Sequence, residues 1–435
     1  MNQASGELDT FLVDLNGILR GKRSPASATN KLLQEGFKMP RSALGVDCWG
    51  DDVVENGLVF ETGDNDGMCV PVSAQTTPIP WLSGDHFQLQ TMMQNPDGSP
   101  FMADPRQILS AVCQRYQQQG LTPVVASELE FYLLAEKELE NNIPVTQQHY
   151  FDWPDAYSIE CIDEKRVVLE DIRQCCEIQG IPADAIISEL GLGQFEINLN
   201  HVPDALQAAD HAVLFKRLVK GVAHKHQHRA TFMPKPFGER SGNGFHLHFS
   251  VLDKAGNNVF DNGSAQGSET LTQAIAGLLL AMDQSMLIFA PGLNAYRRLL
   301  PGSHAPVSAN WGYENRTVSV RVPDSPLVAR RIEHRVSGAD ANPYLVIAVV
   351  LAAALHGIEN QMSPPPACSG DGYSSENLGT PLPTQWLAAI EAMENSELMA
   401  KLLGKEFIRV FCAMKRQEYL KFAQQISHAE YETYF

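Results

Sequence analysis

The feature that most constrains this 435-residue chain is a short stretch, Ser127-Glu-Leu-Glu-Phe-Tyr-Leu-Leu134, in which one apolar residue separates two glutamates. In a β-strand alternate side chains share a face, so Glu128 and Glu130 would project together about 7 Å apart, while the apolar residues face the other way. Paired carboxylates are costly to bury unless a cation, a basic partner or a raised pKa compensates them. The stretch alone fits either a solvent-facing edge strand or one wall of a cation site.

The composition narrows the class of protein. A formal net charge of -18 argues against nucleic acid and anionic membrane as partners, because both are bound through basic surface. No apolar run approaches the length of a membrane span, and the longest, Leu345 to Leu355, has the length of a buried helix. The eight cysteines are scattered, which is typical of reduced cytosolic thiols. We therefore expect a cytoplasmic globular protein.

The chain divides near residue 104. Residues 1–103 have short apolar runs broken by turn residues, which predicts a small sheet-rich domain with one helix near 27–36. Asp104-Pro105 then forms a helix start, with Asp at the N-cap and Pro at the first position of a helix over 106–119. Residues 104–435 would form the second, catalytic domain, in which strands alternate with helices in an α/β or α+β arrangement.

The expected elements of this second domain are as follows. Strands are predicted at 124–134, 193–200, 229–233, 244–252 and 317–322. Helices are predicted at 163–179, 204–227, 268–289, 342–358, 384–395, 397–403 and 405–427.

A second pair of carboxylates lies in the segment from Glu189 to Asn200. Glu196 belongs to a run of polar residues that alternate with apolar ones, so one face carries amides and carboxylates and the other faces the core. Glycines at 191 and 193 let the preceding loop approach closely and bring Glu189 toward the same face. With Glu128 and Glu130 these residues make four carboxylates near one expected site.

Histidines and arginines complete the set. His246, His248 and Ser250 share one face of the strand that follows Gly242-Asn-Gly. Seven arginines lie between 297 and 335, and Arg331, Glu333 and Arg335 would share a face if that segment is extended. Surface salt bridging is the alternative explanation for the arginines. Carboxylates with a histidine suit Mg²⁺ or Mn²⁺, and arginines suit phosphoryl oxygens. The chain has no Gly-x-x-x-x-Gly-Lys-Ser/Thr loop and no kinase motifs, so these residues point to nucleotide-dependent phosphoryl transfer onto an acid, on another scaffold.

In this order the motifs resemble those of the glutamine synthetase family, across nearly the whole chain. The motifs are Ser127-Glu-Leu-Glu-Phe, Glu189 to Glu196, Thr231-Phe-Met-Pro-Lys-Pro236, Gly244-Phe-His-Leu-His, Asn315-Arg-Thr-Val-Ser-Val-Arg-Val-Pro323, and Glu333-His-Arg335 with Ala341-Asn-Pro-Tyr344. Within the family, stretches such as Asp14-Leu-Asn-Gly17 and Arg20-Gly-Lys-Arg23 are more similar to the γ-glutamylputrescine synthetase branch.

The resemblance implies an α+β chain with an N-terminal β-grasp domain and a catalytic domain built on a curved antiparallel sheet with covering helices. It also implies a homo-oligomer, a dodecamer of two hexameric rings, with active sites between subunits. Glutamate, ATP and an amine would be the substrates, and two or more Mg²⁺ or Mn²⁺ ions the cofactors. The γ-carboxylate would attack ATP to give γ-glutamyl phosphate, which the amine then captures.

The resemblance also implies roles for individual residues. Glu130, Glu189 and Glu196 would hold one metal ion, and Glu128, His246 and Glu333 the other. His248, Ser250, Arg321 and Arg331 would contact ATP. Arg298 and Arg335, with Gly242 beside them, would bind glutamate, and Arg316 would stabilise the transferred phosphoryl group.

Two departures from the family pattern concern the amine. Ammonia-using members carry a Glu in the loop after Arg-Leu-x-Pro-Gly, where this chain has His304, a poor trap for ammonium. The Asp-Gly-Ser-Ser of the N-terminal loop is replaced by Asp47-Cys-Trp-Gly50. We therefore expect an organic amine, putrescine or a related polyamine, and acidic residues of the 47–66 segment would receive its distal ammonium. The alternatives are ordinary glutamine synthesis from ammonia and a catalytically silent ring.

Overall fold

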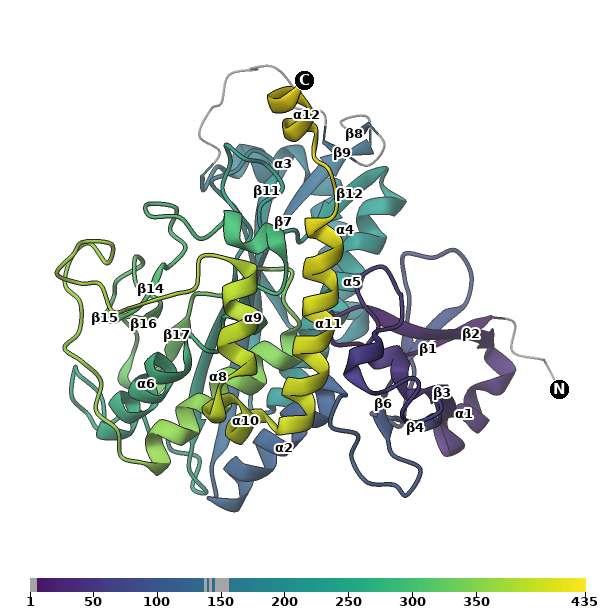
Figure 1. Ribbon diagram of the computed structural model, residues 1–435, viewed down its shortest axis with the longest axis horizontal. Coiled ribbons are helices and arrows are strands. Elements are labelled where there is room, and N and C mark those ends of the chain that lie inside the picture. The colour runs from purple at the N-terminus through teal and green to yellow at the C-terminus, as the bar shows by residue number, and fades with distance from the viewer. Residues whose placement is uncertain (1–5, 137–138, 141–142, 145–155) are drawn as a thin grey trace.

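The computed structural model describes residues 6–136, 139–140, 143–144 and 156–435 (Figure 1). Its strands form two main sheets, one of six strands from residues 7–94 and one of eight strands from residues 122–334. Helices cover the second sheet and lie between the two sheets (Figure 1). The fold class is α+β, as the sequence predicts.

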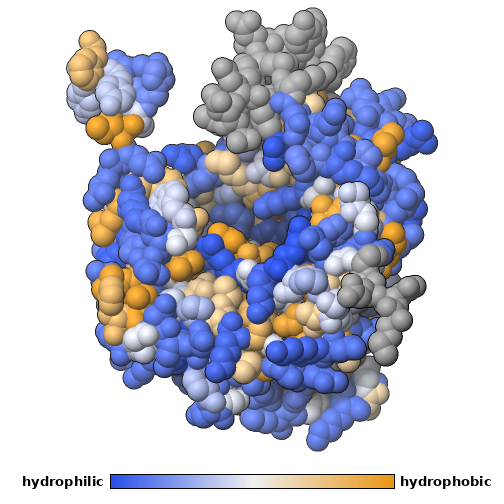
Figure 2. Space-filling view, turned by 90° about the vertical axis from the view of Figure 1, so that its right-hand side faces the viewer, coloured by the Kyte–Doolittle hydropathy of each residue, from blue (hydrophilic) through white to orange (hydrophobic). Residues whose placement is uncertain are grey.

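The first sheet lies at the right of Figure 1, and its strand order is β2-β1-β6-β4-β3 with β5 beside β6. The strands are β1 (Glu7–Val13), β2 (Leu19–Pro25), β3 (Phe37–Pro40), β4 (Asp66–Pro71), β5 (Thr77–Pro78) and β6 (His86–Gln94). β1 runs parallel to β6, whereas the other pairs are antiparallel. The helix expected near 27–36 is α1 (Thr29–Glu35). The face of the molecule that carries this sheet is hollowed near its middle (Figure 2).

Asp104 connects the two parts of the chain. Its buried side chain caps α2 (Pro105–Gln118) by accepting hydrogen bonds from the backbone N–H groups of Arg106 and Gln107. It also accepts a 2.6 Å bond from the N–H of Met93 in β6. The predicted helix start is therefore present, and the same carboxyl group holds the end of the first sheet against it.

The second sheet has the order β10-β11-β7-β13-β17-β16-β15, and β12 pairs with β7 outside this path. Its strands are β7 (Thr122–Ala135), β10 (Ala183–Ser188), β11 (Gln194–Val202), β12 (His228–Thr231), β13 (Phe245–Leu252), β15 (Trp311–Tyr313), β16 (Val320–Val322) and β17 (Ile332–His334). Only the β15–β16 pair is parallel. Two small ribbons complete the described strands, β8 (Leu139–Glu140) with β9 (Ile143–Pro144) and β14 (Ser308–Ala309) with β18 (Thr380–Pro381).

The helices of the second part are α3 (Ile159–Glu164), α4 (Arg166–Gln179), α5 (Ala205–Lys225), α6 (Glu269–Ala281), α7 (Met286–Phe289), α8 (Pro343–Glu359), α9 (Trp386–Glu394), α10 (Glu397–Leu403), α11 (Lys405–Ala423) and α12 (His428–Tyr434). α8 contains the longest apolar run of the sequence and is buried along almost its whole length, as expected. Among the described residues no helix is both long and apolar enough to cross a membrane.

One expected helix is wrong. The segment 268–289, predicted as a single helix, is broken into α6 and α7 around residues 282–285. The hydroxyl of Ser285 donates to the backbone carbonyls of Ala281 and Met282, and such side-chain bonds compete with continuation of a helix. The break turns α7 toward the strands of the second sheet, where Phe289 lies against the ring of His334.

Candidate functional site

The strand register of the second sheet places the predicted carboxylates and histidines beside one another. Glu130 of β7 lies directly opposite Glu196 of β11, and Glu128 lies opposite His246 of β13. On the next pair of strands, His248 lies opposite Glu333 of β17. Because directly paired residues of antiparallel strands share a face, these side chains form one polar surface across four neighbouring strands.

Glu128 lies at the centre of this surface. Its Oε1 is 2.9 Å from Nε2 of His248, and its Oε2 is 3.4 Å from Nδ1 of His246. Among the residues that the structure describes, two groups of three have ligand atoms within 4.8 Å of one another, and Glu128 belongs to both. The first group is Glu128, Glu196 and His246, and the second is Glu128, His248 and Glu333.

Glu333 is almost completely buried and lies between two guanidinium groups. NH1 of Arg321 is 2.8 Å from its Oε2, and Arg335 pairs with its Oε1. Burial opposes ionisation of this carboxyl group, but the charges of Arg335 and of the neighbouring histidines lower its pKa to about 2. Glu333 is therefore an anion held in place by two cations.

Glu189 and Glu196, by contrast, form no ion pair with a described residue. Burial, together with four neighbouring carboxylates, raises the pKa of Glu196 to about 10. Those neighbours are Glu128, Glu130, Glu189 and Glu333. Burial and the charge of Glu130 raise the pKa of Glu189 to about 7. A set of clustered carboxylates whose ionisation is opposed by their own repulsion is the arrangement that a divalent cation stabilises.

Glu130 is oriented by a hydrogen-bond network that sequence patterns do not reveal. Its Oε2 accepts from the N–H of Gly244 at 2.7 Å and from Nε2 of Gln194 at 3.3 Å. The same amide of Gln194 donates to the side-chain oxygen of Asn243 and to the carbonyl of Gly242, both at 3.0 Å. The alternation of Gln194 with apolar residues placed it on the polar face, but its partners come from a loop about 50 residues further along the chain.

A close approach of the chain to Arg298 explains two glycines of this loop. A Cβ atom at Gly242 would lie 2.8 Å from Cγ of Arg298, and one at Gly244 would lie 2.9 Å from its NH2. Arg298 is buried, and its NH1 donates to the carbonyl of Val336 at 2.9 Å. A larger residue at 244 would therefore displace the guanidinium group, and one at 242 would meet the carbonyl oxygen of Pro234, at 2.5 Å, as well as the stem of Arg298.

The remaining predicted residues surround this surface. Nε of Arg331 donates to Nδ1 of His248 at 3.2 Å, so two expected ATP contacts touch each other. Through His248, which lies 2.9 Å from Glu128, Arg331 is joined to the carboxylates. Ser250 is half-buried two residues beyond His248 on β13. Arg316 and His304 are exposed, and His304 has a φ of 58° in the left-handed region. The structure thus brings the predicted metal ligands together on one face of the second sheet. Arg316 and His304 lie outside that sheet, on loops near the edge of this polar surface.

Glu314 is a further residue that the sequence does not reveal. It pairs with Arg321, and its carboxylate also accepts a hydrogen bond from the N–H of Asp324. Arg321 is therefore held by Glu314 on one side and by Glu333 on the other. No periodicity marks Glu314, which lies in a turn after β15 with a φ of 48°.

Two of the acidic residues expected to meet the amine are already paired within the chain. Lys421 of α11 forms ion pairs with both Asp47 and Asp51. Asp47 is buried and accepts from Nε2 of Gln417 at 2.8 Å. α11 therefore holds this loop of the N-terminal part against the second part of the chain.

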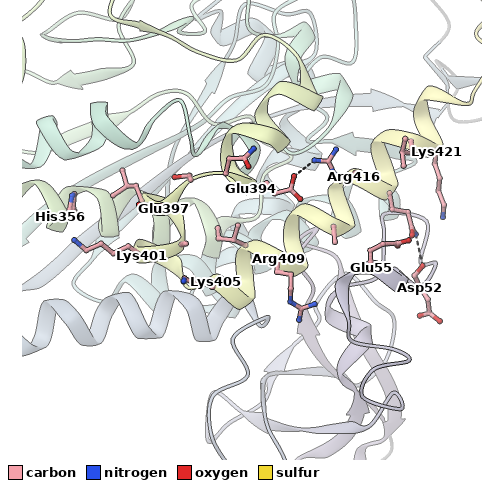
Figure 3. A pocket seen from close by; sticks show the side chains of 18 of the residues that line it. Asp52, Glu55, His356, Glu394, Glu397, Lys401, Lys405, Arg409, Arg416 and Lys421 are labelled. Carbon is pink, nitrogen blue, oxygen red and sulfur yellow. Dashed lines mark hydrogen bonds and ion pairs between the residues drawn. The ribbon is translucent and has the colours of Figure 1, made fainter.

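A large groove lies apart from the carboxylate surface. It has a volume of about 1470 Å³ and lies along α10 and α11, with charged side chains of both signs around it (Figure 3). Arg416 and Glu394 pair with each other across part of this groove, as Figure 3 shows. None of the candidate metal, ATP or glutamate residues lines it, whereas Asp52 and Glu55, two of the acids expected to receive the distal ammonium of the amine, do.

The fold and the site together define a class of protein. A mostly antiparallel sheet presents carboxylates, histidines and arginines on one polar face, which is an arrangement for divalent cations and phosphoryl groups. The glutamine synthetase catalytic domain matches residues 102–434 of the chain. The chain belongs to the glutamine synthetase family.

Individual members of the family, and one solved structure, are similar to the chain over nearly its whole length. It is 40% identical over 430 residues to the γ-glutamylputrescine synthetase PuuA of Escherichia coli (strain K12), a match that covers 98% of this chain and 90% of that protein. It is 33% identical to a glutamate–isopropylamine ligase of a Pseudomonas species, over 93% of this chain and 89% of the relative. The solved structure of GmaS without ligand superposes with a TM-score of 0.86 at 29% identity, covering 99% of this chain and 97% of that one.

Proposed function

We propose that this protein is an ATP-dependent ligase that joins the γ-carboxylate of glutamate to an amine, putrescine or a related polyamine, through γ-glutamyl phosphate. The observation that carries the proposal is the polar face of the second sheet, where Glu128 belongs to two groups of metal-ligand residues with arginines beside them. The amine is proposed because relatives at 40% and 33% identity are named for ligation of glutamate to putrescine and to isopropylamine.

The described residues fit divalent cations. Carboxylate oxygens with one imidazole nitrogen are the donors that Mg²⁺ and Mn²⁺ accept, and the raised pKa of Glu196 reflects negative charge that lacks a counter-ion. We propose that Glu130, Glu189 and Glu196 hold one ion, and that Glu128, His246 and Glu333 hold another, with His248 within reach of the second group. Such ions neutralise charge on the phosphoryl group as it moves.

The arginines have separate tasks in this proposal. Arg298 and Arg335 would bind the carboxylates of glutamate, with Gly242 leaving room for the Arg298 side chain. Arg321 and Arg331, with His248 and Ser250, would contact the phosphates of ATP. Arg316, exposed on a loop, would approach the transferred phosphoryl group once both substrates are bound. Guanidinium groups suit these roles because their planar donors match carboxylate and phosphate oxygens.

The amine then attacks γ-glutamyl phosphate, and phosphate leaves. The attacking nitrogen must lose a proton on its way to the amide, and His304, an exposed imidazole in a loop near the site, is proposed either to take that proton or to shape the amine pocket. Because Asp47 and Asp51 are engaged by Lys421, the remaining acids of the segment, Asp52, Glu55, Asp64 and Asp66, are the better candidates for a distal ammonium.

The test is phosphate release from ATP in the presence of glutamate and Mg²⁺, with one amine at a time. Ammonium, putrescine, spermidine, ethanolamine and small monoamines form the series, and the amide product is identified by mass spectrometry. Preference for a diamine supports the proposal. Preference for ammonium would make the protein a glutamine synthetase, and no turnover with any amine would favour a binding or structural role.

We further propose that residues 1–103 form a β-grasp domain and residues 104–435 the catalytic domain. In the cytoplasm the chain would assemble into a dodecamer of two hexameric rings with active sites between subunits. Native mass spectrometry of the full chain tests the assembly, since a monomer or dimer would contradict it.

A further inference from the structure

A second cavity, of about 670 Å³, lies between the first sheet and α5. Its walls come from β1, β2, the turn between them, α5, and the segments 231–233 and 340–343. It is not the carboxylate surface, since none of the candidate metal, ATP or glutamate residues lines it. The ring of Phe131, which points away from the Glu128 face of β7, packs against Phe215 of α5 and Phe232, so α5 covers the opposite side of the sheet.

The cavity is basic although the chain is acidic. Five cationic residues and two acidic ones line it, in a protein with a net charge of -18. One of the five, Lys22, is turned to the other face of the first sheet, where its ammonium group lies 4.6 Å from the centre of the Phe37 ring. The other four cationic residues that line the cavity are Arg23, Lys216, Arg217 and Lys220.

The two arginines both pair with Asp9, and Arg23 pairs with Glu7 as well. Asp9 of β1 lies 2.7 Å from Nε of Arg23 and 2.6 Å from NH2 of Arg217. Burial opposes ionisation of Asp9, but these two arginines lower its pKa. Asp9 thus holds two guanidinium groups in fixed positions, and because Arg23 also lies 3.4 Å from Glu7, Arg217 is the less compensated of the two.

The two lysines have still less compensation. Lys216 and Lys220 are one helical turn apart on α5, and their ammonium groups lie 5.6 and 5.9 Å from the centre of the Phe232 ring. Within the described part of the chain neither forms an ion pair with a carboxylate. Lys216 instead donates to the backbone carbonyls of Ala341, at 3.2 Å, and Asp340, at 3.5 Å.

Like charges one turn apart on a helix destabilise it, and here they also face a partly buried space. Burial and the charge of Lys220 lower the pKa of Lys216 to about 7. The nearby acid, Asp340, has its pKa raised to about 6 by burial, and its Oδ1 accepts no hydrogen bond from any described residue. Asp340 is thus a weak counter-ion, and an anion from solution would supply the missing charge.

We propose that this cavity is a second binding site, which takes a small metabolite through a phosphate group placed between Lys216 and Lys220. Lysine ammonium groups bind phosphate as point charges, and guanidinium groups add planar donors, from Arg217 on the same helix and from Arg23 on β2. The volume exceeds that of a phosphate ion, and Phe11, Val213 and Phe232 line the rest of it, so a phosphate monoester with a small carbon skeleton fits better than the free ion.

The experiment is isothermal titration of the full-length protein, without ATP or glutamate, with glycerol 3-phosphate and with inorganic phosphate as separate probes. Lys220→Gln removes a cation at the exposed side of the cavity, and Lys216→Met removes the inner one while keeping its apolar stem. Lys225→Gln is the matched control, since Lys225 lies on the same helix but pairs with Asp171.

We expect each cavity variant to weaken binding of the probe about tenfold, as the loss of one charged partner of a phosphate does, and the control to bind as the wild type does. Tighter binding of glycerol 3-phosphate would identify a monoester as the ligand, and equal binding would identify free phosphate. Absence of binding, or equal binding by wild type and Lys220→Gln, would overturn the proposal. Lys220→Gln decides the result even if Lys216→Met fails to fold.

Discussion

Oε1 of Glu128 lies 2.9 Å from Nε2 of His248, on the neighbouring strand, two residues from the histidine that faces Glu128 directly. His248 therefore belongs with the carboxylates as closely as His246 does. The family resemblance gives His248 a role in contacting ATP, whereas this distance places it within reach of a metal ion as well.

Replacing His248 distinguishes these two roles. For His248→Ala we expect the affinity for Mn²⁺ to fall by roughly tenfold to a hundredfold in the absence of ATP, because a group at or beside the metal is lost. Electron paramagnetic resonance of free Mn²⁺ measures this directly. Unchanged Mn²⁺ affinity with weaker ATP binding would leave His248 as a nucleotide contact only. Ser250→Ala, on the same face of β13, is the control.

Among the carboxylates of the site, Glu196 has the most strongly raised pKa, because burial and the surrounding carboxylates oppose its ionisation. Without metal, the raised pKa keeps Glu196 protonated in the folded protein near neutral pH, whereas the unfolded chain ionises it. Glu196→Gln keeps the shape of the protonated group without this uptake of a proton, so we expect the free energy of unfolding to rise by roughly 1 kcal/mol, the equivalent of about one pKa unit. With Mg²⁺ present we expect activity to fall by at least about a hundredfold, as for loss of a metal ligand. Thermal denaturation with and without Mg²⁺ measures the first effect. A variant destabilised in both conditions would contradict the repulsion argument.

Glu314 is expected to act through Arg321. Glu314→Gln removes one of the two carboxylates that hold the guanidinium group, so its position becomes less fixed. We expect the KM for ATP to rise by about threefold to tenfold while the KM for glutamate stays constant, in line with the loss of one charge-assisted hydrogen bond. Steady-state kinetics with each substrate varied in turn measures this. Equal changes in both constants would indicate a general structural role for Glu314.

Asp104 gives a stability that depends on pH in a defined direction. Burial raises the pKa of this carboxyl group to about 6, above its ordinary value of 3.8. The folded state therefore keeps a proton that the unfolded state loses between these pH values, so the contribution of Asp104 to stability falls as pH rises through this window. Asp104→Asn can still cap α2 but cannot titrate.

We expect the difference in unfolding free energy between Asp104→Asn and the wild type to shift in favour of the variant by about 1 to 2 kcal/mol from pH 5 to pH 7. Chemical denaturation at both pH values measures it. A difference that is constant over this range, or that shifts the other way, would show that the carboxyl group is ionised throughout.

The choice of amine is expected to depend on His304. His304→Glu introduces a carboxylate that attracts ammonium, so turnover with ammonia should rise relative to putrescine by roughly tenfold, the effect of about 1.4 kcal/mol. Phosphate release with each amine measures the ratio. His304 has a left-handed backbone, and His304→Asn, a residue that tolerates this conformation and adds no charge, serves as the control.

The sequence by itself determined the elements whose signals are local. Alternation of polar and apolar residues placed Glu128 and Glu130 on one face of β7, because the side-chain period of a strand is two. Asp104-Pro105 marked the start of α2, since capping depends on a few consecutive residues. The ordered motifs identified the family, which the match over residues 102–434 confirms.

Only the tertiary structure decided the relationships between distant segments. The bond from Gln194 to Asn243, the clamp of Glu314 on Arg321, and the pairing of Lys421 with Asp47 each join residues whose separation is set by strand register and loop path. The break between α6 and α7 was likewise hidden, because an apolar segment reads as one helix until its side-chain hydrogen bonds are known. The charges of Lys216 and Lys220 became uncompensated only when folding placed both beside an aromatic ring without pairing either with a carboxylate of the described residues, since a sequence counts charges but does not place them.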